Sequence, residues 1–481
     1  MRPWYAGVFA LVLALFAFTS ADPDLWGHVR FGLDFLDTWA LPSVDPYSFT
    51  QDRPWINHEW LSEAMMAAAY RGAGAPGLAL LKAVLTLAVF VWIWRALRGA
   101  RTGARLAVAT VVWFGTVHIT SSIRPQVWTF LCLAVLWQIL MEHSARRRIW
   151  LPMLFVFWVN VHGGWIVGLG VLGVWAAVQA IIEPRAIRGW AVVCLACAAA
   201  TLCNPYGWDL WRFMAETVRP TREIDEWGAL WGTPLINWIP WFAAVGGMLV
   251  AVRHRTPNRA AITAVLAMLA YGAATVMRIE SLFIESAAFA LAPTVRHWWP
   301  ARPVANSLPP RRVPTAAAVL LLSMPLAAAV WIGRASLGCV AMVNPALPER
   351  TPARWLAAGE PGRLVTAFGW GQYAIWHLGP RLRVSMDGRR ETIYSAARLA
   401  QHDAILAGST AGLVALAEWR AEYVWLPATS RTTKEWLRDH GYRVDVETPQ
   451  SFVAVRGDLP LLLAPTDDVQ AEEGHARCFP D

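Results

Sequence analysis

Residues 166–182 read IVGLGVLGVWAAVQAII, an apolar run that contains no charged side chain. Runs of similar length and nearly the same character recur at 106–123 and at 316–332. The hydrocarbon core of a bilayer requires a helix of close to this length. The sequence therefore predicts an α-helical membrane protein that crosses the bilayer several times.

The overall composition agrees with this class. Of the 481 residues, 56% are hydrophobic and only 16% are charged, whereas about a quarter of the residues in soluble proteins are charged. The net charge of +8 does not indicate a nucleic-acid partner, because most arginines lie in short segments between apolar runs, where they orient the spans. The expected surroundings are membrane lipids.

The apolar runs define about eleven spans, each placed to within a few residues. They cover residues 4–20, 76–94, 105–120, 127–142, 149–161, 164–182, 189–203, 236–252, 260–277, 280–295 and 314–332. The first run has no convincing cleavage site before Asp22, so it is interpreted as a retained anchor. Arginines concentrate in every second intervening segment. The positive-inside rule then predicts a cytoplasmic N-terminus and an extracytoplasmic C-terminal domain.

The predicted organisation is a membrane domain of residues 1–332 followed by a soluble domain of residues 333–481. Two long outer loops, 21–75 and 204–235, interrupt the membrane domain. In the soluble domain predicted strands and helices alternate, which is typical of a small α/β fold. Strands are expected at 363–368, 381–386, 423–426, 442–446 and 452–455, and helices at 371–378, 391–419 (possible break at Gly408) and 434–440.

Local signals add detail to the two outer loops and to the cysteines. Asp22-Pro23 and Asn204-Pro205 each resemble an N-cap followed by proline at the first helical position, which predicts short helices in both loops. Cys339 and Cys478 both fall on the predicted outer side, where they are able to form a disulfide. The sequence alone does not test that pairing.

Polar residues gather at the predicted outer ends of the spans, far apart in the sequence but in one leaflet. They are Asp22, Asp24, His28, His58, Glu59, Glu63, Arg124, Asn160, His162, Asn204, Tyr206, Asp225, Glu226, Arg278, Glu280 and Glu285. Ionisable groups in or beside membrane spans are costly, so their presence indicates function. Together they predict an outward-facing polar cavity.

Asp22 and Asp24 form an Asp-x-Asp pair, and His28 follows Asp24 by four residues, on one face of a helix that Pro23 would open. Carboxylates so placed either bind a divalent cation or supply a general base. The structural alternatives are an N-cap for Asp22, a solvated acid for Asp24 and an interfacial histidine for His28.

Each of the remaining polar groups has both a functional and a structural interpretation. His58 and Glu59, with Glu63, form either a site or the polar face of an amphipathic helix, and no second histidine completes a zinc-protease motif. Arg124 and Arg278 either bind a phosphate or extend to the interface as snorkelling side chains.

Seven segments of the chain resemble a group of bacterial multispanning membrane proteins related to the GT-C superfamily of polyprenyl-phosphate-sugar-dependent glycosyltransferases. They are DPDLWGHVRFG (22–32), LPSVDPYSFT (41–50), PWINHEWLSE (54–63), SIRPQVWTF (122–130), NVHGGWIVGL (160–169), CNPYGWDLW (203–211) and MDGRRETIY (386–394). The resemblance covers most of the chain. It implies a GT-C-like helix bundle with an acidic motif in the first outer loop.

The resemblance also implies roles for individual residues. Asp24, with Asp22 second, acts as the base or helps to hold a divalent metal ion, Mg²⁺ or Mn²⁺. His58 and Glu59 belong to the acceptor or base region, and Arg124 and Arg278 contact the donor phosphate. The other expected substrate-binding residues are His28, Asn160, His162, Asn204 and Tyr206. The segment Asp387-Gly388-Arg389 recurs in the group without an assigned role, and a tight β-turn is its structural alternative.

The function expected from these features is transfer of a sugar from a polyprenyl-(di)phosphate-linked donor to an acceptor glycan, lipid or protein, outside the bacterial cytoplasmic membrane. One rival is a transporter or flippase of a lipid-linked precursor. The middles of the predicted spans argue against it, because they are nearly devoid of charge apart from Lys82. The other rival is a non-catalytic membrane assembly protein of the same fold.

Overall fold

The computed structural model describes residues 4–142, 144–217, 228–253, 258–301, 315–342, 347–463 and 477–481. The chain divides into two compact units. A helical unit comprises Met1–Thr19 and Pro76–Gly338, and an α/β unit comprises Ser20–Ala75 and Cys339–Asp481. The first predicted outer loop therefore packs with the C-terminal part of the chain into one compact body.

The helical unit has a helix at each range for which an apolar span was predicted. These helices are α1 (Trp4–Ala17), the second part of α3 (Trp60–Ala96), α4 (Thr102–Thr120), α5 (Gln126–Met141), α6 (Leu151–Val161), α7 (Trp165–Ile182), α8 (Ile187–Ala200), α10 (Trp238–Val252), α11 (Arg259–Thr275), α12 (Glu280–Ala290), α13 (Ala292–Trp298) and α14 (Thr315–Gly338). A short helix, α9 (Trp208–Thr217), lies in the predicted second outer loop, of which residues 218–227 are outside the described residues.

By length and composition, three helices in the described part of the chain are able to cross a membrane. They are Trp60–Ala96, Trp165–Ile182 and Leu235–Val252. Shorter apolar helices occur at Thr102–Val117, Gln126–Met141, Arg259–Thr275 and Leu326–Gly338. The predicted class of helical membrane protein is thereby supported, and the number of spans stays a prediction.

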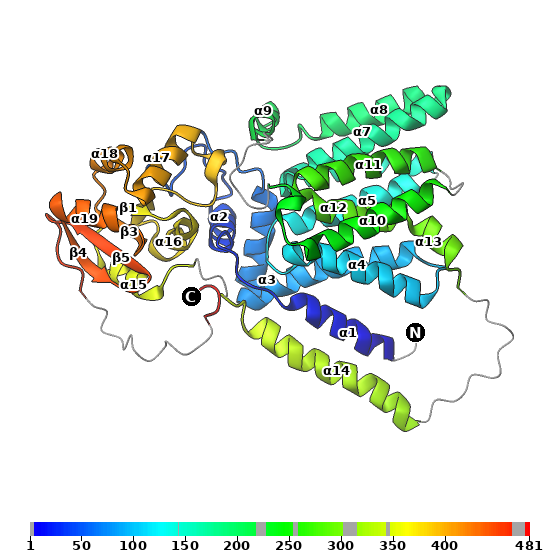
Figure 1. The fold of residues 1–481 in the computed structure, drawn as a ribbon, viewed down its shortest axis with the longest axis horizontal. Coiled ribbons are helices and arrows are strands. Elements are labelled where there is room, and N and C mark those ends of the chain that lie inside the picture. Colours follow the sequence, from blue (N-terminus) through cyan, green and yellow to red (C-terminus); the bar gives the residue numbers. More distant parts are fainter. Residues whose placement is uncertain are drawn as a thin grey trace. The chain divides into compact units, whose positions relative to one another are not determined.

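Helix α12 lies at the centre of the helical unit, and every one of its residues is buried. It packs against α4, α5, α10 and α11 (Figure 1). Gly115 allows α4 to pack closely against α12, because a Cβ at this position would overlap the side chain of Ile284. In the same unit, α1 and α14 run side by side.

The α/β unit is built on a five-stranded mixed sheet in the order β2-β1-β3-β5-β4. The strands are β1 (Gly362–Thr366), β2 (Leu382–Val384), β3 (Tyr423–Pro427), β4 (Tyr442–Glu447) and β5 (Ser451–Arg456), and the helices are α2 (Leu25–Thr38), the start of α3, α15 (Arg350–Ala358), α16 (Gly371–Leu378), α17 (Ala396–Ala407), α18 (Thr410–Trp419) and α19 (Arg431–Asp439). Strands β2, β1 and β3 are parallel, whereas β5 runs antiparallel to both β3 and β4. A small α/β domain was predicted here.

Individual elements follow the predictions closely, with a few informative differences. The predicted break at Gly408 occurs, because this glycine has a left-handed φ of 67° and separates α17 from α18. Helix α15 was not predicted. The helix starts expected at Pro23 and Pro205 come later, at Leu25 and Trp208. The side chains of Asp22 and Asn204 each accept a hydrogen bond from the backbone N–H two residues on, and this turn precedes the helix.

Covalent and aromatic contacts close the α/β unit. Cys339 and Cys478 form a disulfide across 139 residues, one of the outcomes that the sequence left open. Beside it, the indole Nε1 of Trp26 on α2 donates a hydrogen bond to the carbonyl of Pro480 at 2.8 Å. Phe479 packs against Trp26 and against Trp376 of α16. Residues from both ends of the sequence therefore share one core.

Candidate functional site

The acidic motif of the first loop is held in a defined turn. The Asp22 carboxylate accepts a hydrogen bond from the backbone N–H of Asp24 at 2.9 Å, and Asp22 is buried. Asp24 is the N-cap residue of α2, and its carbonyl accepts the N–H of His28 at 3.0 Å. The geometry gives Asp22 a positioning role and places Asp24 and His28 one helical turn apart.

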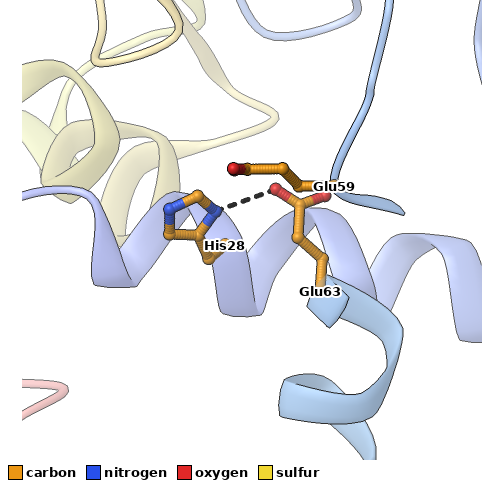
Figure 2. Close-up of side chains that lie close together, drawn as sticks. All are labelled: His28, Glu59 and Glu63. Carbon is orange, nitrogen blue, oxygen red and sulfur yellow. Dashed lines mark hydrogen bonds and ion pairs between the residues drawn. The ribbon is translucent and has the colours of Figure 1, made fainter. Parts of the chain in front are cut away.

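His28 faces a carboxylate that comes from the next helix. Its Nδ1 lies 2.9 Å from Oε1 of Glu63, in the first turn of α3 (Figure 2). The second oxygen of Glu63 accepts a hydrogen bond of 2.6 Å from the amide of Asn57. Gly32 allows α2 and α3 to meet here, because a Cβ at Gly32 would overlap the backbone carbonyl of Glu63.

The carboxylate of Glu59 completes a three-residue cluster with His28 and Glu63. One ligand atom from each of the three lies within 4.8 Å of the other two, and Figure 2 shows the three side chains converging. His58 contributes from the side, with its Nε2 3.6 Å from Oε1 of Glu59. Imidazole nitrogen and carboxylate oxygen are both metal ligands, so the three residues are chemically compatible with a divalent cation.

Without a metal, the same cluster holds a proton. Burial by itself lowers the pKa of His28, but the hydrogen bond to Glu63 and the charges of Glu63, Glu59 and Asp24 outweigh burial and raise the pKa to about 9. A protonated His28 offsets part of the negative charge of Glu59 and Glu63.

The C-terminal domain contributes directly to the surroundings of Asp24. The side chain of Gln372, on α16, accepts a hydrogen bond from the N–H of Gly27 at 3.1 Å. The backbone at Gly388 lies against the Asp24 carboxylate, because a Cβ on Gly388 would overlap Oδ1 of Asp24. Any larger residue at position 388 would have to displace this carboxylate.

Next to Gly388, Arg389 is buried in a fully paired ion network. Its guanidinium donates to Asp45 at 2.6 Å and to Asp387 at 2.6 Å, and both carboxylates are fully buried. The hydroxyl of Tyr394 donates to Asp387 at 3.1 Å. Three rings surround the cation, those of Phe31, Tyr47 and Trp55. The segment that lacked a role is therefore a clamp that fixes the C-terminal domain to the first loop.

The predicted site residues of the helical unit occupy helix ends and tight turns. The amide of Asn160, at the end of α6, donates to the carbonyls of Val156 and Cys203 at 2.8 and 2.9 Å. Asn204 follows, and its side chain accepts the N–H of Tyr206 at 2.8 Å and donates to the carbonyl of Thr201. These contacts join the end of α6 to the turn after α8.

His162 caps α6 and contacts the start of α5. Its Nδ1 lies 2.7 Å from the hydroxyl of Thr129 and accepts the N–H of Gly164 at 3.0 Å. A Cβ on Gly164 would overlap this hydroxyl, which explains the glycine. Arg124 lies in the short link between α4 and α5, and Arg278 in the 3-10 turn before α12.

Comparisons with solved structures identify the architecture. The chain matches ArnT from Cupriavidus metallidurans in the apo state with a TM-score of 0.56 and 12% identity, over 94% of this chain and 97% of that one. It matches the same protein bound to undecaprenyl phosphate with a TM-score of 0.53 and 12% identity, over 94% and 96% of the two chains. The chain has the GT-C fold. No protein-family model matches it, and no curated protein matches it in sequence.

A second solved structure with the GT-C fold supports this assignment. The archaeal oligosaccharyltransferase AglB from Archaeoglobus fulgidus, in complex with an inhibitory peptide and a dolichol-phosphate, matches with a TM-score of 0.59 and 10% identity. The match covers 95% of this chain and 75% of that one. The GT-C resemblance seen in the sequence is thus confirmed at the level of the fold.

Within this GT-C fold, the structure brings together some of the predicted residues and adds others. His28, Glu59 and His58 converge with Asp24 close by, and in the helical unit Asn160 adjoins Asn204. Sequence reasoning had not assigned a role to Asn57, Gln372 or Asp45. Asp45 lies in the segment LPSVDPYSFT and Asn57 in PWINHEWLSE, both of which carry the family resemblance. The sequence did not show that Asp45 pairs with Arg389 or that Asn57 bonds to Glu63.

Proposed function

We propose that this protein is a membrane glycosyltransferase that moves a sugar from a polyprenyl-(di)phosphate-linked donor to an acceptor on the extracytoplasmic face. The observation that carries the proposal is the ordered cluster of Asp24, His28, Glu59 and Glu63 in a chain with the GT-C fold. Two matched structures hold undecaprenyl phosphate and dolichol-phosphate, which supports a lipid-linked donor.

Sugar transfer requires a base for the acceptor hydroxyl and stabilisation of the leaving phosphate. Asp24 is the proposed base, since Asp22 fixes its turn and Gly388 lies against its carboxylate. Arg124 and Arg278 are the proposed phosphate-binding residues, because a planar guanidinium matches phosphate geometry. His28, Asn160, His162, Asn204 and Tyr206 are proposed to shape the substrate site.

A divalent metal ion is part of the proposal. The sequence placed Mg²⁺ or Mn²⁺ on Asp22 and Asp24, and the structure offers a further ligand set in His28, Glu59 and Glu63. An imidazole ligand suits Mn²⁺ better than Mg²⁺, which prefers oxygen alone. Such an ion would supply positive charge for the donor phosphate.

The test is a transfer assay with purified protein in detergent and a panel of radiolabelled polyprenyl-phosphate and polyprenyl-diphosphate sugars. Asp24→Asn removes the proposed base and is expected to lower turnover by about 10²–10⁴-fold. The matched control is Asp37→Asn, in the same helix, where the carboxylate is 61% exposed and pairs with Arg71 at the surface. This variant should keep wild-type turnover.

Each result decides between the readings. Turnover by wild type and Asp37→Asn, but not by Asp24→Asn, supports the transferase and its base. Equal turnover by all three keeps the enzyme and removes Asp24 as its base. No turnover with any donor by a folded wild-type protein rejects the transferase in favour of a transporter or an assembly protein.

Metal dependence is read in the same assay. Chelation followed by addition of Mn²⁺ or Mg²⁺ should abolish and then restore turnover, and Glu59→Gln should raise the Mn²⁺ concentration needed for half-maximal activity. Turnover that survives chelation unchanged would exclude the metal from this reaction.

A further inference from the structure

Glu285 occupies the middle of α12, inside the helical unit. Its exposed fraction is 0%, and neither carboxyl oxygen has a hydrogen-bond partner among the described residues. The sequence had grouped this residue with polar groups at the outer ends of spans. The structure instead places it within a helix whose residues are all buried.

Some other buried polar groups of the helical unit have hydrogen-bond partners within the chain. Lys82 on α3 donates to the carbonyls of Phe18 and Thr120 at 2.9 and 2.8 Å. Ser281, one turn before Glu285, donates to the carbonyl of Gly115 at 2.9 Å. Several other buried side-chain atoms of this unit also lack a partner among the described residues, including those of Thr86, Trp137 and Ser286, but Glu285 has two such oxygens on one ionisable group. A buried ionisable group without a described partner calls for an explanation, such as a bound ligand.

A small cavity lies beside the Glu285 side chain. It is about 10 Å³ in volume, which is close to the room that one water molecule needs. Its walls come from α3, α4, α5 and α12, and they include Thr86, Thr116 and Thr120 among mostly apolar side chains. The hydroxyls of Thr116 and Thr120 already donate to helix carbonyls, so they offer only lone pairs. The hydroxyl of Thr86 has no partner among the described residues.

The surroundings decide the charge of this carboxyl. An ionised carboxylate without a hydrogen-bond donor or a cation is far more costly inside a bundle than a neutral acid. Of the helices packed against α12, α5 has one titratable residue, the buried Cys132. Helix α10 has no titratable residue. On α4, Arg105 is held at the carbonyl of Trp94, and the side chain of His118 lies outside the described part of the structure. Arg259 of α11 is held at the carbonyl of Val252, and Tyr271 of α11 is exposed.

We propose that Glu285 is an intramembrane proton-binding site, whose carboxyl is neutral at rest and exchanges its proton with a water molecule in the adjoining cavity. The ligand is a proton, and a small monovalent cation is the competing occupant that the test distinguishes. A proton-binding carboxyl inside a span is the kind of group that proton-relay and transport proteins use. Glu285 belongs to the helical unit, whereas the cluster around Asp24 belongs to the α/β unit.

The first measurement is the infrared spectrum of purified wild type and of Glu285→Gln. A protonated carboxyl has a C=O stretching band that a carboxylate lacks. At neutral pH the wild-type-minus-Glu285→Gln difference spectrum should contain this band, and the difference spectrum of the matched control Glu183→Gln, an exposed carboxyl of the helical unit, should not. Loss of carboxylate bands instead, in the Glu285→Gln difference spectrum, would show an ionised group and overturn the proposal.

The second measurement tests exchange and the identity of the ligand. In heavy water the band should shift as the proton is replaced by a deuteron, and a band that never shifts in the folded protein would overturn the proposed exchange. A hydrophobic carbodiimide, which reacts with protonated carboxyls, should label Glu285 in wild type and in the control Glu183→Gln. Protection from this label by Na⁺ would replace the proton with a metal cation. No donor sugar is required, so the outcome is independent of the transferase assay.

Discussion

Arg389 and Glu285 are both buried ionisable residues, but their surroundings are opposite. The guanidinium of Arg389 is 6% exposed and meets two carboxylates and three aromatic rings. The carboxyl of Glu285 is 0% exposed and has no described partner. The charge of Arg389 is fully compensated within the chain, whereas the described residues offer the carboxyl of Glu285 no partner.

The difference distinguishes a buried charge that stabilises the fold from a buried acid that is available to bind a ligand. A buried charge with complete partners fixes one arrangement of the chain, because removing one partner leaves the others uncompensated. A buried acid without partners is neutral, because ionising it inside the protein costs far more free energy than keeping the proton. The three predictions that follow test this distinction, in order of decreasing effect.

The largest effect is expected from Arg389→Met. This variant leaves Asp45 and Asp387 buried without a cation, so it should lower the free energy of unfolding of the α/β unit by about 3–5 kcal/mol. Thermal unfolding and limited proteolysis of the purified protein measure the loss. Arg438→Met is the matched control, since its partner Glu447 is 3.5 Å away and both side chains are about half exposed. Equal stability of the two variants would contradict the clamp.

A smaller, pH-dependent effect is expected at His377. Burial lowers the pKa of this histidine to about 4, below its ordinary value of 6.5. The unfolded chain therefore binds more protons than the folded one between these values. Stability of the α/β unit should be complete above pH 6.5 and should fall as the pH drops toward 4. His377→Gln should flatten this dependence, whereas the exposed His440→Gln should leave it unchanged.

The smallest effect is expected from Glu285→Gln. A neutral acid is replaced by a neutral amide of nearly the same shape, so the free energy of unfolding should change by about 1 kcal/mol or less. Thermal unfolding in the same detergent gives a direct comparison with Arg389→Met. A loss as large as that of Arg389→Met would mean that Glu285 is ionised and paired, which would erase the distinction between the two regions.

Much of the fold was predictable because its signals are local. Apolar runs located the helices of the helical unit, and the short alternating runs after residue 333 located every strand of the sheet. Gly408 was correctly suspected as a break, because only a residue tolerant of positive φ ends a helix in this way. Helix α15 was missed since its nine residues contain a proline and mostly polar or small side chains.

The site was only partly predictable because its contacts join distant residues. The sequence identified the acids and histidines of the first loop as candidate site residues, but not which of them pair. The pairing of His28 with Glu63 depends on how α2 crosses α3 at Gly32. The partners Asp45 and Arg389 are 344 positions apart. A single sequence contains no information on such a pair. The interior position of Glu285 was missed for the same reason, since burial is set by neighbouring helices.

The α/β unit has a consequence for biosynthesis. Its first part, residues 20–75, is translated before the helical unit, and its second part, residues 339–481, afterwards. The indole N–H of Trp26 donates its hydrogen bond to the carbonyl of Pro480, which is translated 454 positions later. During synthesis the emerging first loop therefore exposes Trp26 until the segment that contains Phe479 and Pro480 has been translated. Such an intermediate is prone to aggregation, which makes this chain an expected client of chaperones that hold unfinished segments.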